Sequence, residues 1–234
     1  MQINASRVIR WSGLAAFVAG IIFAGIQPIH PADAVASVNT TAWAVITSLK
    51  TVMCLLFLAG ITGLYGRQVD KAGWLGLAGF VLLGISWALQ TAFVFAEAFI
   101  LPSLATLAPT FVDGVLRSLT SGEASAANLG ALPAIYTLVG VTYILGGLVF
   151  GVATFRAGIL SRWAAGLLAV AAALTPVTVV LPHPVARLAA VPTAVALAWL
   201  GFSLWSERRV QAAAPSARTP HLAGLWRSLL ESAL

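Results

Sequence analysis

The chain has 234 residues, of which 60% are apolar and 9% are charged, and its mean hydropathy is +0.96. This composition excludes a soluble globular domain, and the apolar runs leave no room for a separate soluble catalytic domain. The formal net charge of +6 comes from basic residues at the ends of apolar runs rather than from one basic patch, so we expect no nucleic-acid partner. The sequence therefore predicts an all-α integral membrane protein with one domain.

Six apolar runs are long enough to cross about 30 Å of hydrocarbon, which takes roughly 20 helical residues. They lie near residues 11–29, 41–65, 73–101, 133–155, 160–181 and 184–205. The sequence thus predicts a polytopic bundle of six transmembrane helices within residues 1–209. A removable signal peptide is the alternative interpretation of the first run, but this run is longer than the usual apolar core of about 7–15 residues.

Basic residues mark alternate connections between these runs. They are Arg7 and Arg10, then Arg67 and Lys71, then Arg156 and Arg162, and finally Arg208 and Arg209 after the sixth run. By the positive-inside rule, both termini are expected to be cytoplasmic.

Two segments outside the runs are predicted to be amphipathic. The outer loop, residues 102–132, contains "TFVD" at 110–113, a weak capping box followed by apolar residues on one helical face. The tail, residues 210–234, carries a similar pattern after "AAAPSARTP", and we expect it to form a helix on the cytoplasmic leaflet.

Small residues and prolines predict details of the helix packing. Ala16, Gly20 and Ala24 recur on one face of the first run, and the fourth run contains Gly147 and Gly151. In lipid, helices associate by close backbone approach, so these faces are expected to be packing seams. Pro176 and Pro192 are expected to kink the fifth and sixth helices, because each removes a backbone donor.

Two ionisable residues, Lys50 and Glu97, lie inside the runs. A charged side chain at mid-helix costs roughly 2.5–3.5 kcal/mol on insertion scales, so it needs a partner, water or a route to the interface. Helical rise places Lys50 roughly 14 Å and Glu97 roughly 7 Å from the outer ends of their helices. Because helical side chains lean toward the N-terminus of their own helix, Lys50 reaches outward and Glu97 inward. We therefore expect the ammonium and the carboxylate to meet.

Further side chains are expected to complete a polar vestibule in the outer half of the bundle. The polar candidates are Gln90, Gln27, His30, His183 and Arg187, and the candidates for an apolar wall are Trp43, Trp87, Phe93 and Phe95. Three interpretations of the central pair stay open. It holds two helices in register, it forms a ligand or proton site, or its side chains reach separately to the interface.

No metal or cofactor is predicted. The sequence has no HxxxH or HExxH spacing, and it lacks a P-loop, a GxGxxG before a helix and a GxSxG. The single cysteine, Cys54, excludes an internal disulfide.

Three stretches carry a resemblance to known proteins. At "HPADAVASVNTTAWAVITSLK", "GITGLYGRQVDKAGWLGLAGFVLLG" and "AEAFILPSLATLAP", the chain resembles a group of uncharacterised bacterial six-helix membrane proteins. The resemblance covers residues about 10–205. It implies a bacterial inner-membrane location and brings no activity with it.

Three classes of function remain. The first is a binding or transport module whose vestibule takes up a small amphipathic molecule, an ion or a proton. The second is a membrane-embedded enzyme for a lipid or isoprenoid, with Glu97 as general acid. An ammonium beside Glu97 favours the ionised carboxylate, which opposes proton donation, so we prefer the first class. The third is a scaffolding subunit of a larger membrane complex, or a homo-oligomer. Membrane lipid is the expected partner in every case.

Overall fold

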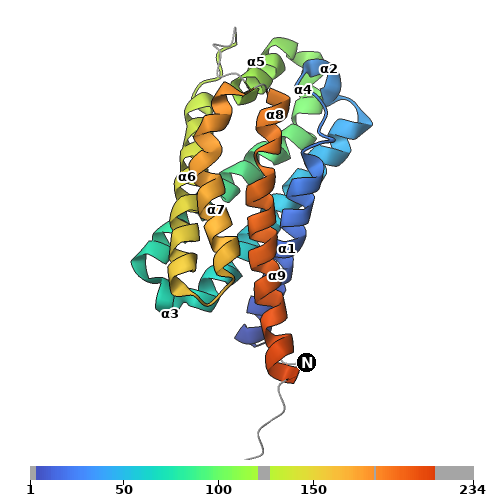
Figure 1. The fold of residues 1–234 in the computed structure, drawn as a ribbon. Helices are drawn as coiled ribbons and strands as arrows, with labels where there is room; N and C mark the ends of the chain where they lie inside the picture. The colour runs from blue at the N-terminus through green and yellow to red at the C-terminus, as the bar shows by residue number, and fades with distance from the viewer. Residues whose placement is uncertain (1–3, 121–126, 182, 214–234) are drawn as a thin grey trace, which may run out of the picture.

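The computed structural model describes residues 4–120, 127–181 and 183–213, and every regular element in these ranges is a helix (Figure 1). The elements are α1 (Ala5–Ile26), α2 (Val35–Val38), α3 (Thr41–Phe99), α4 (Leu101–Leu107), α5 (Pro109–Thr120), α6 (Leu132–Ala157), α7 (Arg162–Leu174), the 3₁₀ helix η1 (Thr175–Val180), α8 (His183–Leu188) and α9 (Val191–Ala213). The all-α class predicted from the composition is confirmed. The amphipathic tail helix, predicted within residues 210–234, falls outside the described residues from position 214 onward.

Four helical segments are long and apolar enough to cross a membrane: Ala5–Ile26, Thr41–Phe99, Leu132–Ala157 and Val185–Glu207. The apolar segment Arg162–Thr178 is shorter. Large apolar side chains also cover the outside of the bundle, including Leu55 at 53% and Phe202 at 45% exposure. Soluble proteins rarely expose this many large apolar side chains. The fold is therefore consistent with a multi-pass membrane protein.

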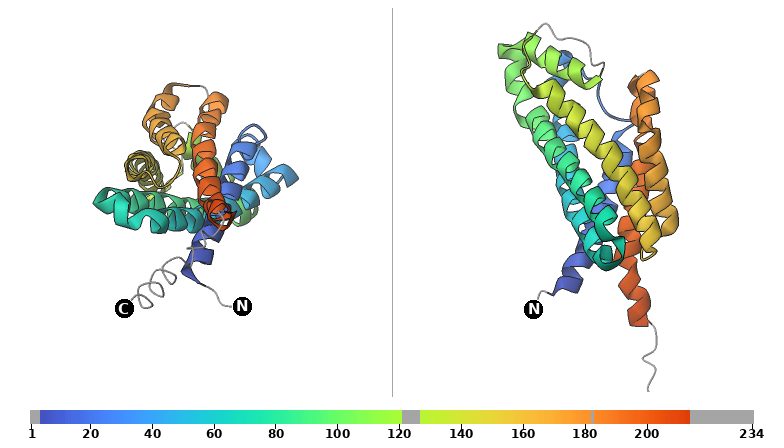
Figure 2. Two further views of the ribbon diagram at one scale, coloured as in Figure 1. Left: turned by 60° about the horizontal axis from the view of Figure 1, so that its bottom comes forward. Right: turned by 90° about the vertical axis from the view of Figure 1, so that its left-hand side faces the viewer.

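The longest helix, α3, spans 59 residues and contains two of the predicted runs. The chain reverses direction at Gly73, whose φ of 57° and ψ of −158° are accessible almost only to glycine (Figure 2). A Cβ at Gly73 would meet no atom within 4 Å, so the backbone conformation, and not crowding, requires glycine there. As a result, α3 consists of two antiparallel arms, residues 41–72 and 74–99.

The two prolines act at helix ends rather than inside continuous helices. Pro176 follows the end of α7 and lies in the first turn of η1. Pro192 is the second residue of α9, where an α-helix has no acceptor for its backbone donor. The disruption predicted at Pro192 is therefore present, as a break in the helix just before this residue. The sixth run is divided into α8 and α9 by a turn at residues 189–190.

Small residues let the helices approach closely. A Cβ on Gly20 of α1 would lie 2.6 Å from the backbone oxygen of Ala194 in α9. A Cβ on Gly151 of α6 would lie 2.7 Å from the backbone nitrogen of Ala169 in α7. Helix α1 packs against both α3 and α9, with Ala16 fully buried. The predicted seams are thus used within the chain, and α1 is part of the core.

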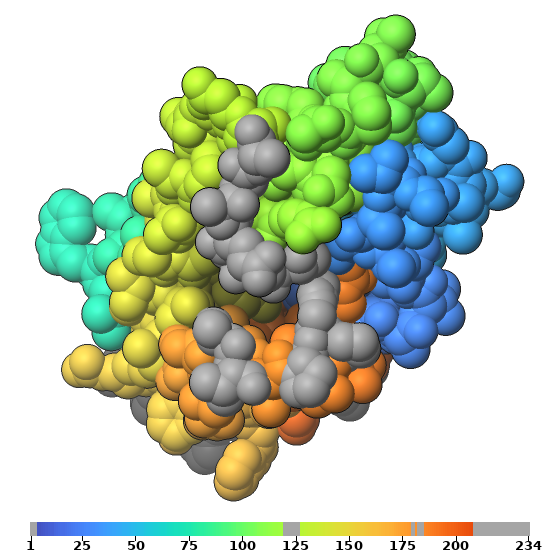
Figure 3. All heavy atoms as spheres, turned by 90° about the horizontal axis from the view of Figure 1, so that it is seen from above, coloured from blue at the N-terminus to red at the C-terminus, as the bar shows by residue number. Residues whose placement is uncertain are grey.

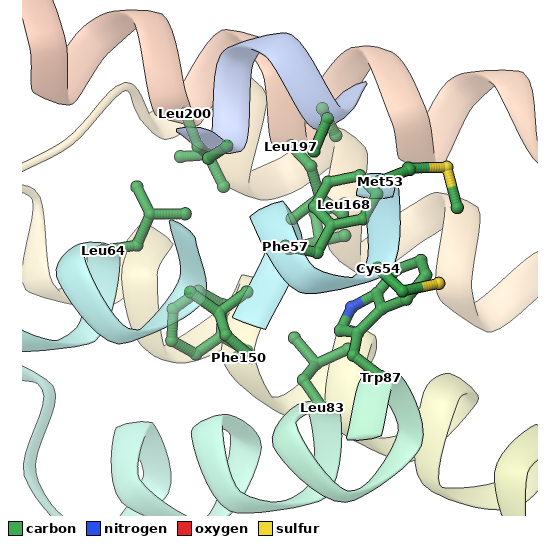
Figure 4. Packing of buried hydrophobic residues seen from close by; sticks show 14 of the residues in the cluster. Met53, Cys54, Phe57, Leu64, Leu83, Trp87, Phe150, Leu168, Leu197 and Leu200 are labelled. Carbon is green, nitrogen blue, oxygen red and sulfur yellow. The ribbon is translucent and has the colours of Figure 1, made fainter. Parts of the chain in front are cut away.

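Side chains from α1, α3, α6, α7 and α9 fill the centre of the bundle, and Figure 4 shows part of this cluster. Phe57 stacks on Trp87 with ring centroids 4.4 Å apart, and both are fully buried. A second apolar cluster, which includes Trp43, Val112 and Leu116, lies where α2, α4 and α5 cover one end of the bundle. Helix α5 therefore uses the apolar face predicted for this loop to close that end.

Candidate functional site: a polar cavity at one end of the bundle

A cavity of about 360 Å³ lies toward the end of the bundle that carries α2, α4 and α5. Figure 3 looks onto this end, where these helices, α6 and α8 reach the surface. The polar residues of the lining are Gln27, His30, Asp33, Lys50, Gln90, Glu97, Tyr136 and Arg187. The remaining lining residues are Phe23, Ile26, Met53, Phe93, Val94, Val139 and Gly140. One space is thus bordered by four charged groups and a largely apolar wall. We call it the outer-end cavity, after the side of the membrane on which the sequence predicted the vestibule.

Lys50 and Glu97 form an ion pair in this cavity. Lys50 Nζ lies 2.5 Å from Glu97 Oε2, and the side chains are 18% and 7% exposed. They come from the two arms of α3, which the reversal at Gly73 places side by side. Trp43 Nε1 donates to the backbone oxygen of Glu97 at 2.9 Å, which ties the two arms together at the same level. The structure brings the two charges together as helical rise and side-chain direction predicted.

His30 extends the ion pair. Its Nδ1 lies 2.7 Å from the backbone oxygen of Pro31, which can only accept, so Nδ1 carries the proton. Nε2 is then an acceptor, 3.5 Å from Lys50 Nζ. Burial and the Lys50 charge lower the pKa of His30 to about 4. Near neutral pH, His30 is therefore uncharged and helps to satisfy the Lys50 ammonium.

A second ion pair joins Arg187 of α8 to Asp33, which lies between α1 and α2. Both groups are mostly buried, with side-chain exposures of 20% and 10%. Arg187 was a predicted vestibule residue, but its pairing with Asp33 was not predicted. Asp33 lies in the connection between the first and second apolar runs, which is expected on the same side of the membrane as Arg187. This shared side was the feature of the sequence that could have indicated the pair.

Two polar groups of the lining have no hydrogen-bond partner among the residues that the structure describes. Within the described part of the chain, neither the Gln90 amide nor the Tyr136 hydroxyl makes a hydrogen bond, although Tyr136 stacks on Phe93 at 3.9 Å between centroids. Gln27 donates its Nε2 to the backbone oxygen of Phe23 at 2.9 Å. Polar groups lacking a protein partner at a cavity are normally satisfied by water or by a ligand. Tyr136 was not predicted, because nothing local distinguishes it from an interfacial tyrosine.

Three of the residues predicted for the apolar wall do not border the cavity. Trp43 and Trp87 are fully buried and do not line the cavity, and Trp87 lies behind Phe23 at 5.7 Å between centroids. Phe95 is 49% exposed on the outside of the bundle. The rotation of each helix turns these three side chains away from the cavity, and their part in a ligand site stays a prediction. His183 begins α8, and its side chain falls outside the described part of the structure.

Within the described residues, no three His, Cys, Asp or Glu side chains are placed to hold a metal ion. No protein-family model, curated protein or solved structure matches the chain. The resemblance to bacterial six-helix membrane proteins therefore stays a prediction.

Proposed function

We propose that this protein is a multi-pass protein of a bacterial inner membrane that binds a small amphipathic molecule in the outer-end cavity. The membrane would be crossed by α1, the two arms of α3, α6, α7 with η1, and α9, with both termini in the cytoplasm. The observation that carries the proposal is the mixed lining of the cavity, about 360 Å³ in volume. Ligand pockets are typically roughly 300–1,000 Å³, mostly apolar, with a few polar groups that orient the ligand.

The lining favours a ligand with a polar head and an apolar body. Gln90 and Tyr136 offer unused donors and acceptors beside the Lys50–Glu97 pair. Phe23 and Met53 offer apolar contact surface in the same space. Transport of this molecule, or of an ion or a proton, is an extension that requires a second, inward-facing state.

The other two classes find less support. With Lys50 Nζ 2.5 Å from Glu97 Oε2, the carboxylate is an acceptor held by an ammonium, which is unsuited to proton donation. The small-residue seams that would favour a scaffold are occupied by contacts within the chain, such as Gly20 against Ala194. Association with further copies or with a larger complex stays a prediction.

Native mass spectrometry of the full chain, purified in a mild detergent, tests the binding proposal. Gly140 lines the cavity, and a Cβ there would meet no atom within 4 Å, so Gly140→Leu should fill the cavity without changing any charge. Gly84→Leu is the matched control, because its Cβ also meets nothing and it does not line the cavity. We expect a small molecule to accompany the wild type and Gly84→Leu, and to be lost from Gly140→Leu. Equal retention by the two variants, or no such molecule on the wild type, would show that the proposal is wrong.

The proposed orientation is tested by labelling intact cells with a membrane-impermeant maleimide. Cys54 is fully buried, so the native chain should give little background. Thr106→Cys in α4 and Asp70→Cys beside the Gly73 reversal place exposed thiols at opposite ends of the bundle. We expect labelling of Thr106→Cys in intact cells and of Asp70→Cys only after permeabilisation. The reverse pattern would place the outer-end cavity on the cytoplasmic side.

A further inference from the structure

The opposite end of the bundle contains a second cavity, and we propose that it binds a phosphate group. Its volume is about 260 Å³, and its polar lining consists of Ser6, Arg10, Arg67 and Glu207. These residues come from the beginning of α1, from the first arm of α3 and from α9 near its end. The chain's N-terminus marks this end in Figure 1, far from α2, α4 and α5. We call it the N-terminal-end cavity.

The two arginines of this cavity are in different states. Arg67 is held by Glu207 through two bonds, from Nε to Oε2 at 2.8 Å and from Nη2 to Oε1 at 2.5 Å. Arg10 has no such carboxylate partner within the described residues. Its buried Nε makes no hydrogen bond, and its Cζ lies 5.9 Å from the centroid of the Trp205 ring. A buried donor without an acceptor is costly, and because Arg10 lines this cavity, we infer that its guanidinium finds the missing acceptor there.

Charge and geometry indicate that the missing acceptor is an anion. Arg10 and Arg67 exceed the single Glu207 carboxylate by one positive charge. A guanidinium presents several donors in a rigid fork that matches the oxygens of a phosphate. Ser6 adds a hydroxyl to the same lining. The cavity thus offers donors and net positive charge in one place, which is what a phosphate requires.

The surroundings of the cavity place it where lipid headgroups lie. Trp11, Trp74 and Trp163 are 65%, 85% and 79% exposed. They follow Arg10, Gly73 and Arg162, respectively, so they mark this same end of the bundle. Exposed indoles at helix ends are typical of the membrane–water interface. The phosphate can therefore belong to a lipid headgroup or to a soluble anion.

The test compares retention of dioleoyl-phosphatidylglycerol by the full chain in non-ionic detergent, measured by native mass spectrometry. Losing a charge-assisted hydrogen bond should weaken binding by about tenfold or more, so Arg10→Gln should retain far less lipid than the wild type. Arg156→Gln is the matched control, since Arg156 is an exposed residue near the end of α6 and does not line the cavity. It should bind as the wild type does. Glu207→Gln should increase retention, because it removes the competing carboxylate.

A steric variant keeps the test decisive if Arg10→Gln does not fold. Gly66 lines the cavity, and a Cβ there would meet no atom within 4 Å, so Gly66→Leu should occupy the space while both arginines remain. We expect it to lower retention about as much as Arg10→Gln does. Equal loss in Arg10→Gln and Arg156→Gln, or unchanged retention in Gly66→Leu, would overturn the proposal.

Competition with inorganic phosphate distinguishes the two sources of the group. If millimolar inorganic phosphate displaces the lipid from the wild type, the site accepts a soluble phosphate. If it does not, the site is specific for the lipid headgroup. Gly140→Leu, which fills the outer-end cavity, should not alter lipid retention, so failure of one proposal leaves the other open.

Discussion

Removing one member of the Lys50–Glu97 pair should destabilise the fold more than removing both. Glu97→Gln leaves an ammonium that is 18% exposed and has only neutral acceptors beside it, namely the new amide oxygen and His30 Nε2 at 3.5 Å. Breaking a buried ion pair costs about 3–5 kcal/mol, and contact with the cavity reduces the expected loss to about 2–3 kcal/mol. Lys50→Met should lower the free energy of unfolding by a similar amount, because it leaves the buried Glu97 carboxylate without its ammonium partner. The double variant should lie within about 1 kcal/mol of the wild type, because no uncompensated charge remains.

Unfolding in detergent by titration with sodium dodecyl sulfate measures these differences, with tryptophan fluorescence as the signal, to which the buried Trp43 and Trp87 contribute. The tryptophan bond to Glu97 uses a backbone oxygen, so the substitutions leave it in place. The exposed pair Arg117–Asp113, with side chains 56% and 46% exposed, is the control and should show a coupling below about 0.5 kcal/mol. If the double Lys50/Glu97 variant loses the sum of the two single losses, the burial argument is wrong.

Two further predictions concern packing and pH. Gly79→Ala would place a Cβ 2.4 Å from the backbone nitrogen of Phe150, so it should cost about 2 kcal/mol or more in the same unfolding assay. Gly84→Ala, whose Cβ meets no atom within 4 Å, should be neutral or stabilise by up to about 1 kcal/mol, and equal effects would contradict the packing argument. His30 has a folded pKa of about 4 against an ordinary value of 6.5, so between these values the unfolded chain binds a proton that the folded chain does not. Stability should therefore fall as the pH falls from about 6.5 toward 4, by less than about 1.4 kcal/mol per pH unit, since the ring is only partly buried. His30→Gln should reduce this fall between about pH 7 and about pH 5, whereas an unchanged pH dependence would show that His30 is not its source.

The sequence by itself determined the properties that depend on one helix at a time. The lengths of the apolar runs established the all-α class, because only a helix satisfies its own backbone in hydrocarbon. The approach of Lys50 and Glu97 also followed from one-dimensional quantities, namely the rise per residue and the lean of helical side chains. The reversal at Gly73 then placed the two arms of one helix against each other. The contact between Lys50 and Glu97 therefore depends on two consecutive helical arms and a single turn.

The tertiary structure alone decided which side chains share a space. The rotation of each helix about its axis turned Trp87 into the core and Phe95 outward, and local periodicity does not determine that rotation. Arg187 forms an ion pair with Asp33, although 154 positions separate them in the sequence. Tyr136 of α6 lines the same cavity. Arg10 was predicted only as a topology signal, but the packing of α1 against α9 left its Nε buried without a hydrogen-bond acceptor among the described residues. Burial and pairing are properties of the assembled bundle, because each depends on several helices at once.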